Sequence, residues 1–147
     1  MDPAFRSAIA RGLELGLNRA LAYDPGSQAA LAQLSGRWLK VEFRKPDFDL
    51  YCGFTTEGLT LASYRDDTID CTITGTAPAI AGLLWREGHS LAGSGVQVNG
   101  DANLLHQVQQ ILADLELDWE QLLYEAIRGA TTPAAGFVQQ LLPVEFQ

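Results

Sequence analysis

The sequence predicts an α+β domain with one five-stranded, mostly antiparallel sheet and helices stacked on one of its faces. Two helical segments come first. Four short runs with strand-like alternation then follow one another through short turns between residues 37 and 74, which favours an antiparallel meander. Helical periodicity returns after these runs, on both sides of a fifth short strand. Helices and strands therefore occupy largely separate parts of the chain.

The first helix is predicted over residues 3–22, because its apolar side chains recur every 3.6 residues. Asp24-Pro25-Gly26 interrupts the pattern. Ser27 is then expected to cap a short second helix over residues 27–34. The side chains of the first apolar face are Phe5, Ile9, Leu13, Gly16, Leu17 and Ala20.

The strand-like runs are bounded by turn signals. Lys45-Pro46-Asp47 separates the first two runs, and Glu57-Gly58 separates the second from the third. Gly93-Ser94-Gly95 precedes the fifth run; it fails as a dinucleotide fingerprint because no third glycine is present and a strand follows it. The predicted strands cover residues 37–43, 48–54, 59–64, 69–74 and 96–99.

The remaining helices have recognisable ends. Pro78 opens a helix expected to reach Glu87. Asp101 and Asp118 are expected to cap two more helices, the second ending at Gly129. These helices are predicted over residues 101–115 and 118–128, with a looser one over 133–142. The whole chain, 1–147, is interpreted as one domain: N-terminal helices 3–34, a sheet over 36–99 with the inserted helix 78–87, and C-terminal helices 101–142.

Composition and net charge limit the classes of function that the chain can have. Hydrophobic residues make up 47% of the 147 residues, enough for a sizeable core. The net charge is −8, and residues 66–147 hold 2 Lys/Arg against 11 Asp/Glu. Such an acidic chain repels phosphate backbones, which argues against nucleic-acid binding. Arg6, Arg11 and Arg19 on the first helix leave peripheral membrane contact open, although a solvated helix face explains them equally simply.

The sequence predicts a cytoplasmic protein. No apolar run is long enough to span a membrane, and Asp2, Arg11 and Glu14 interrupt any signal-peptide core. Cys52 and Cys71 lie in apolar strand-like runs without a CxxC motif, so buried thiols are expected rather than disulfides.

No catalytic or metal-binding set is recognisable, and no cofactor is predicted. His89 and His106 lack Cys or carboxylate neighbours at ligand spacing. His89-Ser90 has no orienting third group, and the acidic residues from Asp66 to Asp70 fit a polar turn better than an acid/base pair. We therefore expect no enzyme; an enzyme using His89 or this turn is the alternative.

The helix over residues 78–87 departs from ordinary amphipathicity because it is apolar nearly all round. It could be sandwiched in the core, line a cavity, or expose an apolar patch to a partner. The second explanation makes its apolar residues, with the stripes of the two following helices, candidates for the lining of a cavity that holds an apolar ligand. Trp85 is a candidate for the mouth of this cavity, and Phe137, Val138, Leu141 and Leu142 are candidates for a lid. The candidate lining is Ile80, Leu83, Leu84, Trp85, Leu104, Leu105, Val108, Ile111, Leu112, Trp119, Leu122 and Leu123.

Several strings resemble a known family. These are Leu17 to Leu21 (LNRAL), Asp70-Cys71-Thr72, Val96 to Asp101 (VQVNGD) and Leu112 to Glu120 (LADLELDWE). Together with the order of elements, they resemble the sterol-carrier-protein type-2 fold, and within it the UbiJ-like accessory factors of ubiquinone biosynthesis. The resemblance extends from about residue 5 to about residue 128. It implies an internal apolar cavity between the sheet and its helices.

The resemblance also implies a role. The expected ligand is a polyprenylated ubiquinone precursor or another lipid, held for the biosynthetic enzymes that modify the ring, without catalytic residues. A scaffold that assembles those enzymes without carrying lipid is the alternative. A UbiK-like helical partner is expected only if the native chain continues past Gln147, because residues 131–147 show no heptads.

Overall fold

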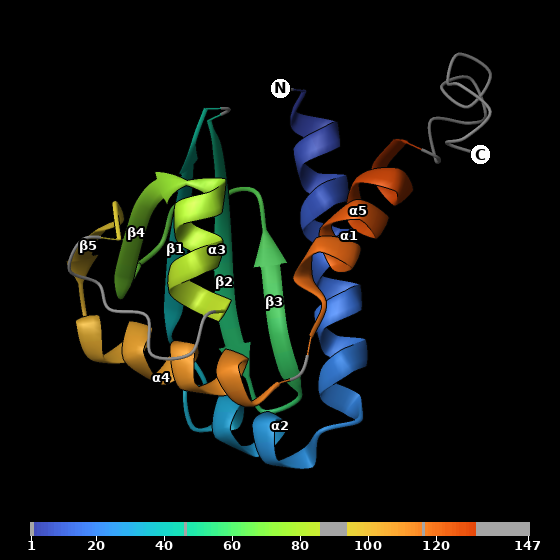
Figure 1. Cartoon of the computed structure of the whole chain (residues 1–147). Helices are drawn as coiled ribbons and strands as arrows, with labels where there is room; N and C mark the ends of the chain where they lie inside the picture. Colours follow the sequence, from blue (N-terminus) through green and yellow to red (C-terminus); the bar gives the residue numbers. More distant parts are fainter. Residues whose placement is uncertain (1, 46, 86–93, 116, 132–147) are drawn as a thin grey trace.

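The computed structural model describes residues 2–45, 47–85, 94–115 and 117–131 (Figure 1). Over these residues the chain forms five helices and five strands, which confirms the predicted α+β class. In chain order they are α1 (Pro3–Ala22), α2 (Pro25–Ala32), β1 (Trp38–Arg44), β2 (Phe48–Thr55), β3 (Gly58–Ala62), β4 (Cys71–Thr76), α3 (Ala77–Trp85), β5 (Gln97–Gly100), α4 (Ala102–Asp114) and α5 (Trp119–Thr131).

The five strands form one mixed sheet in the order β3-β2-β1-β4-β5. Neighbours pair antiparallel except β1 and β4, which are parallel. The predicted four-strand meander is therefore wrong at its last step: β4 does not pair with β3 but lies on the other side of β1. The segment between β3 and β4 is too long for a tight turn and crosses to the far side of β1 instead.

Side chains of this crossover hold it against β1. The Arg65 guanidinium stacks on the Trp38 ring, 3.7 Å from its centroid. Asp70 pairs with Trp38 twice: its backbone N–H donates to the Trp38 carbonyl at 2.9 Å, and its Oδ2 accepts from the Trp38 N–H at 2.8 Å. These bonds place the start of β4 beside β1, which sets the parallel register that begins at Leu39 and Cys71.

The strand register gives the sheet one apolar face. Leu39 lies opposite Cys52, and Val41 lies opposite both Leu50 and Ile73. Because alternate side chains share a face, these residues point the same way. Helices α3 and α4 lie over this face (Figure 1). The other face carries polar side chains such as Lys40 and Glu42, which form an ion pair at 2.9 Å.

Helix α1 lies along β3, the edge strand (Figure 1). Asn18 hydrogen-bonds both backbone groups of Leu59, and the Glu14 carboxylate accepts from the Leu61 N–H at 2.9 Å. These side chains satisfy edge groups that would otherwise be free to pair with another strand.

Helix α5 packs against α1 at two glycines. A Cβ at position 12 would lie 3.0 Å from the Ala126 Cα, and a Cβ at position 16 would overlap the Leu122 side chain. The absence of these Cβ atoms lets the two helices approach closely. Helix α5 continues through Gly129 to Thr131, so the predicted end at Gly129 is wrong. Gly129 does not adopt the left-handed conformation of a helix-ending glycine.

The predicted caps are largely confirmed. Asp101 Oδ1 accepts from the N–H groups of Asn103 and Leu104, and Asp118 Oδ1 accepts from the Gln121 N–H. Asp24, not Ser27, caps α2: the Asp24 carboxylate accepts from the Ser27 N–H at 3.1 Å, and proline follows it at the first helical position. The end predicted at Glu87 for the helix over 78–87 and the whole helix predicted over 133–142 lie outside the described residues.

No described helix is both long and apolar enough to cross a membrane.

Candidate functional site

A cavity of about 150 Å³ lies between the apolar face of the sheet and four helices. Strands β1, β2 and β3 form its floor, and α1, α3, α4 and α5 form its walls and roof. Every lining side chain is apolar or a thiol, so the cavity offers hydrocarbon surface and no charge. Its lining is Leu13, Leu17, Leu39, Val41, Phe43, Leu50, Cys52, Phe54, Leu59, Leu61, Ala77, Ile80, Ala81, Leu84, Val108, Leu112, Leu122 and Leu123.

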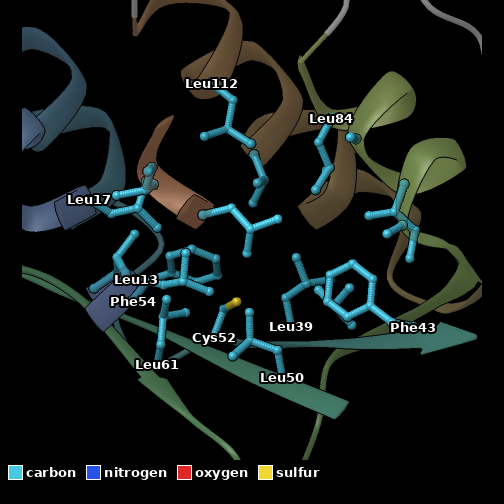
Figure 2. A pocket seen from close by; sticks show the side chains of 18 residues that line it. Leu13, Leu17, Leu39, Phe43, Leu50, Cys52, Phe54, Leu61, Leu84 and Leu112 are labelled. Carbon is cyan, nitrogen blue, oxygen red and sulfur yellow. The ribbon is translucent and has the colours of Figure 1, made fainter. Parts of the chain in front are cut away.

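Figure 2 shows how the floor and the roof face each other. Leu39, Leu50 and Cys52 project from the strands, while Leu84 and Leu112 project towards them from the helices. The Cys52 sulfur is the one heteroatom among the side chains that line this cavity. A polar headgroup would therefore find no hydrogen-bond partner of ordinary strength inside it.

Six of the twelve residues predicted to line a cavity do so: Ile80, Leu84, Val108, Leu112, Leu122 and Leu123. Ile111 instead lines a smaller neighbouring cavity. Whether any of them binds lipid stays a prediction.

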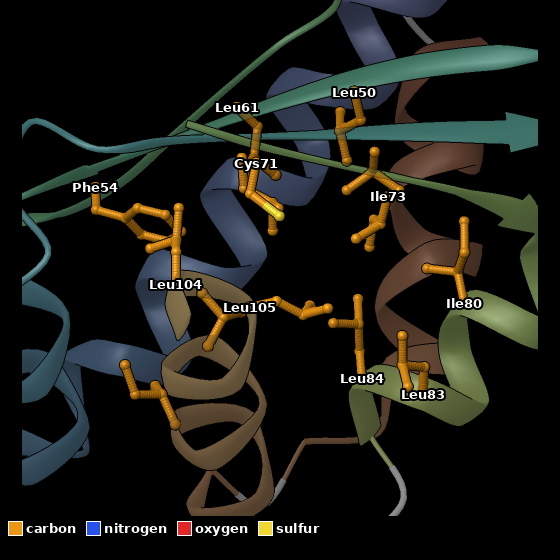
Figure 3. Close-up of a cluster of buried hydrophobic side chains, with 14 of the residues drawn as sticks. Leu50, Phe54, Leu61, Cys71, Ile73, Ile80, Leu83, Leu84, Leu104 and Leu105 are labelled. Atoms are coloured by element: carbon orange, nitrogen blue, oxygen red, sulfur yellow. The ribbon is translucent and has the colours of Figure 1, made fainter. Parts of the chain in front are cut away.

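Three other candidates are placed elsewhere. Leu83, Leu104 and Leu105 are buried in the hydrophobic core and do not border the cavity (Figure 3). An apolar stripe alone did not distinguish them from wall residues, because both kinds point inwards. The side chains of Trp85 and Trp119 and all of residues 137–142 lie outside the described part of the chain.

The sequence interpretation missed the floor of the cavity and the α1 wall. Leu39, Leu50 and Cys52 belong to the alternating strand pattern, and Leu13 and Leu17 belong to the apolar face of the first helix. Strand alternation places Leu39, Leu50 and Cys52 on one face of the sheet, and helical periodicity places Leu13 and Leu17 on one face of the helix. What these patterns could not show is that the helices stand off the sheet far enough to leave space.

Helix α3 is apolar nearly all round because it borders the cavity on one side and packs in the core on another. Ile80, Ala81 and Leu84 border the cavity, while Leu83 is buried and its carbonyl accepts from Gln109 Nε2 on α4 at 3.0 Å. The helix is thus both sandwiched and a cavity wall. Ala77, at its start, borders the cavity and is exposed to solvent.

Burial keeps both thiols protonated. It raises the pKa of Cys52 to about 12 and the pKa of Cys71 to about 11. Because the thiolate is the nucleophile, neither group is activated for covalent chemistry at neutral pH. Both cysteines are free, as predicted.

The acidic turn is structural. Asp70 accepts from the Trp38 N–H and pairs with Arg37 at 3.5 Å, and Asp67 accepts from the Thr68 N–H at 2.7 Å. Among the described residues, no group of three or more His, Cys, Asp or Glu side chains could hold a metal ion. His106 is exposed on α4; His89 and Ser90 lie outside the described residues.

Solved structures with related folds include a "UbiJ-SCP2 Ubiquinone synthesis protein", with a TM-score of 0.66 at 22% identity, covering 74% of this chain and 96% of that one. A crystal structure of sterol carrier protein 2 gives a TM-score of 0.48 at 13% identity, covering 84% of this chain and 96% of that one. A possible sterol carrier protein from Thermus thermophilus gives 0.44 at 18% identity, covering 92% of each chain.

No curated protein sequence matches the chain. The model of the SCP-2 sterol transfer family matches residues 17–113, which is more than half of the chain and includes the sheet, α3 and most of α4. The chain belongs to the SCP-2 sterol transfer family.

Proposed function

We propose that this protein is a non-catalytic lipid carrier that holds the hydrocarbon part of an apolar ligand in the cavity between its sheet and helices. The observation that carries the proposal is the lining: it is apolar throughout and draws on three strands and four helices. A polar substrate or a charged intermediate would lose its hydration there without compensation. A hydrocarbon chain has no strong hydration to lose, so entering this cavity carries no such cost.

The size of the cavity defines what enters it. An apolar cavity of about 150 Å³ is the size that holds one benzene molecule. The described form therefore accepts the end of a chain, roughly six carbon atoms, and a longer segment enters by displacing side chains. At about 0.8 kcal/mol per buried CH₂, six carbons contribute on the order of 5 kcal/mol before the costs of binding are subtracted.

The specific role that we propose is in ubiquinone biosynthesis. The ligand would be a polyprenylated intermediate, and the partners would be the enzymes that modify its ring. Support comes from the fold shared with a ubiquinone synthesis protein and from the hydrocarbon nature of a polyprenyl tail. The free thiols fit a reducing compartment, so we place this role in the cytoplasm.

A scaffold that assembles these enzymes without carrying lipid is the second candidate. The domain family does not by itself separate the two roles. The cavity favours the carrier, because a pure scaffold needs no apolar space beneath its helices.

Mass spectrometry of an organic extract of the purified protein tests the proposal. Prenyl quinone precursors, phospholipids or fatty acids are expected to co-purify or to bind on addition. A protein that carries none and binds none on addition would contradict the carrier function and favour the scaffold.

The two cysteines provide a second readout on the unaltered protein. Cys52 lines the cavity, whereas Cys71 is buried in the core without bordering it. Bound lipid is expected to slow modification of Cys52 by a small methanethiosulfonate more than that of Cys71. Equal slowing at both thiols would indicate general stabilisation of the fold rather than occupation of the cavity.

A filled cavity provides the matched variant. Ala81→Phe places a ring in the space that Ala81 borders, whereas Ala113→Phe adds the same group to the exposed side of α4. Loss of lipid in the first variant only, with both still folded by circular dichroism, supports the site.

A further inference from the structure

A second apolar cavity of about 30 Å³ lies beside the main one. Residues of α1, α2, β2, β3 and α4 line it together with Leu115, which caps α4, and none comes from α3 or α5. It therefore lies on the α2 side of the main cavity, away from α3. Its lining is apolar throughout, so water entering it would find no hydrogen-bond partners.

Five side chains line both cavities: Leu17, Phe54, Leu59, Val108 and Leu112. Residues that border two spaces lie between them, so these five form a wall. Phe54 and Leu59 reach the wall from the sheet, and the other three reach it from α1 and α4. Figure 2 shows Leu17 and Phe54 at the same end of the main cavity.

The five residues of this wall carry apolar side chains that can change rotamer. Leu112 is half-buried rather than locked in the core, and its helix has exposed residues on either side of it along the polar face. We expect a small shift of Leu112 or a rotation of Phe54 to join the two spaces, because both side chains border each of them.

We propose that the two cavities are consecutive parts of one linear site, in which Leu112 and Phe54 determine how long a hydrocarbon chain the protein accepts. This inference rests on the proposed lipid-carrier function. The chain enters at the α3 end and its terminal carbons pass the wall to reach Leu31 of α2. Filling the second cavity restores dispersion contacts that its lining otherwise lacks.

A length series of ligands tests this. Saturated fatty acids from hexanoate to palmitate are the probes, and their affinities are measured by calorimetry. Affinity should rise about fourfold for each CH₂ that enters the site, which is ~0.8 kcal/mol converted to a ratio, and then level off. The chain length at which it levels off reports the depth of the site.

Three variants distinguish the two cavities. Leu112→Ala removes part of the wall and should move the plateau to chains longer by about two carbon atoms. Leu31→Phe fills only the second cavity and should move it to shorter chains. Leu123→Ala, which borders only the main cavity, is the control and should change all affinities by a similar factor without moving the plateau.

A measurement on the unaltered protein guards against variants that fail to fold. With a fatty acid labelled with ¹³C at its terminal methyl group, nuclear Overhauser contacts to Leu21 and Leu31 are expected, since these residues border only the second cavity. Nuclear Overhauser contacts to Leu84 alone would show that the chain end stays in the main cavity, which would overturn the inference.

The same experiments distinguish failure of the linear site from failure of the lipid-carrier function. Fatty acids that bind with the same plateau in wild type, Leu112→Ala and Leu31→Phe would reject the linear site and leave the carrier function intact. Absence of binding by every chain length in the wild-type protein would reject both.

Discussion

The side-chain amide of Asn18 pairs with the backbone of Leu59 as a neighbouring strand would. Its Nδ2 donates to the Leu59 carbonyl at 2.8 Å, and its Oδ1 accepts from the Leu59 N–H at 2.9 Å. Leu59 lines both cavities and lies on the edge strand β3. One residue of α1 thus protects the sheet edge and fixes a wall of the candidate site.

Asn18→Ala should therefore destabilise the fold and loosen β3. Two part-buried hydrogen bonds are lost and two backbone groups of Leu59 lose their partners, which we expect to cost about 1–3 kcal/mol. Urea unfolding measures the loss, and hydrogen exchange at the Leu59 amide locates it. An unchanged unfolding midpoint would show that water replaces the amide without cost.

Asn18→Asp is the matched control. A carboxylate keeps the acceptor for the Leu59 N–H but places an oxygen against the Leu59 carbonyl instead of a donor. It should be less stable than wild type at neutral pH. The difference should shrink in acid, where the protonated carboxyl can donate.

The same substitution should affect stability differently at two helical glycines, one inside the α1–α5 contact and one outside it. At position 129 a Cβ meets nothing within 4 Å, so Gly129→Ala should stabilise the helix by about 0.5–1 kcal/mol. At position 12 the Cβ would press on the Ala126 backbone, so Gly12→Ala should gain less or lose stability. Thermal unfolding compares them, and equal gains would show that the helices do not touch there.

A larger side chain at the same contact should affect the cavity. Gly12→Leu is expected to push α5 away from α1 and with it Leu122 and Leu123, which line the cavity. Hydrogen exchange of the α5 amides should accelerate and fatty-acid affinity should fall. Full retention of affinity would show that α5 contributes no essential wall.

The buried thiols predict a loss of stability in alkali. The folded pKa of Cys52, about 12, lies above the ordinary value of 9.0, so the unfolded chain releases this proton first. The stabilisation is complete below pH 9 and is lost as the pH rises from 9 towards 12. The measurement is the difference in the slope of stability against pH between wild type and Cys52→Ala, because contributions common to both proteins cancel in it. Parallel stability curves would show that Cys52 ionises as readily in the folded state.

The local elements of this fold are readable from the sequence, whereas its long-range pairing is not. The bounds predicted for the first helix match the observed ones because its ends carry strong signals, Pro3 at one and Asp24-Pro25 at the other. Placing β4 beside β1 depends instead on Asp70 and Arg65 meeting Trp38, a contact across about thirty residues that no local pattern contains.

For a similar reason, the sequence predicts which residues of the candidate site face inwards but not which of them border the cavity. Helical stripes identify Leu84 and Leu112 as inward-facing, and strand alternation does the same for Leu39. Inward-facing residues become core or cavity wall depending on how far apart the layers stand. That spacing depends on several elements together, including the glycine contacts between α1 and α5.

The polar face of the sheet offers a last prediction, at Trp38. Its ring lies against Gly53, where a Cβ would come within 2.5 Å of Cζ2, and the Arg65 guanidinium stacks on the ring. Gly53→Ala must displace the ring, which we expect to cost about 1–3 kcal/mol. Arg65→Ala removes only the cation–π contact, about 0.5–1 kcal/mol.

The two substitutions should not be additive. Once Gly53→Ala has displaced the Trp38 ring, Arg65 has no surface left to stack on, so its removal should cost little more. A double-mutant cycle by urea unfolding measures this coupling, and an interaction of at least about 0.5 kcal/mol is expected for groups that share a partner. Additive losses would mean that Arg65 contributes to stability through contacts other than the Trp38 ring, such as its bond to the Thr68 carbonyl.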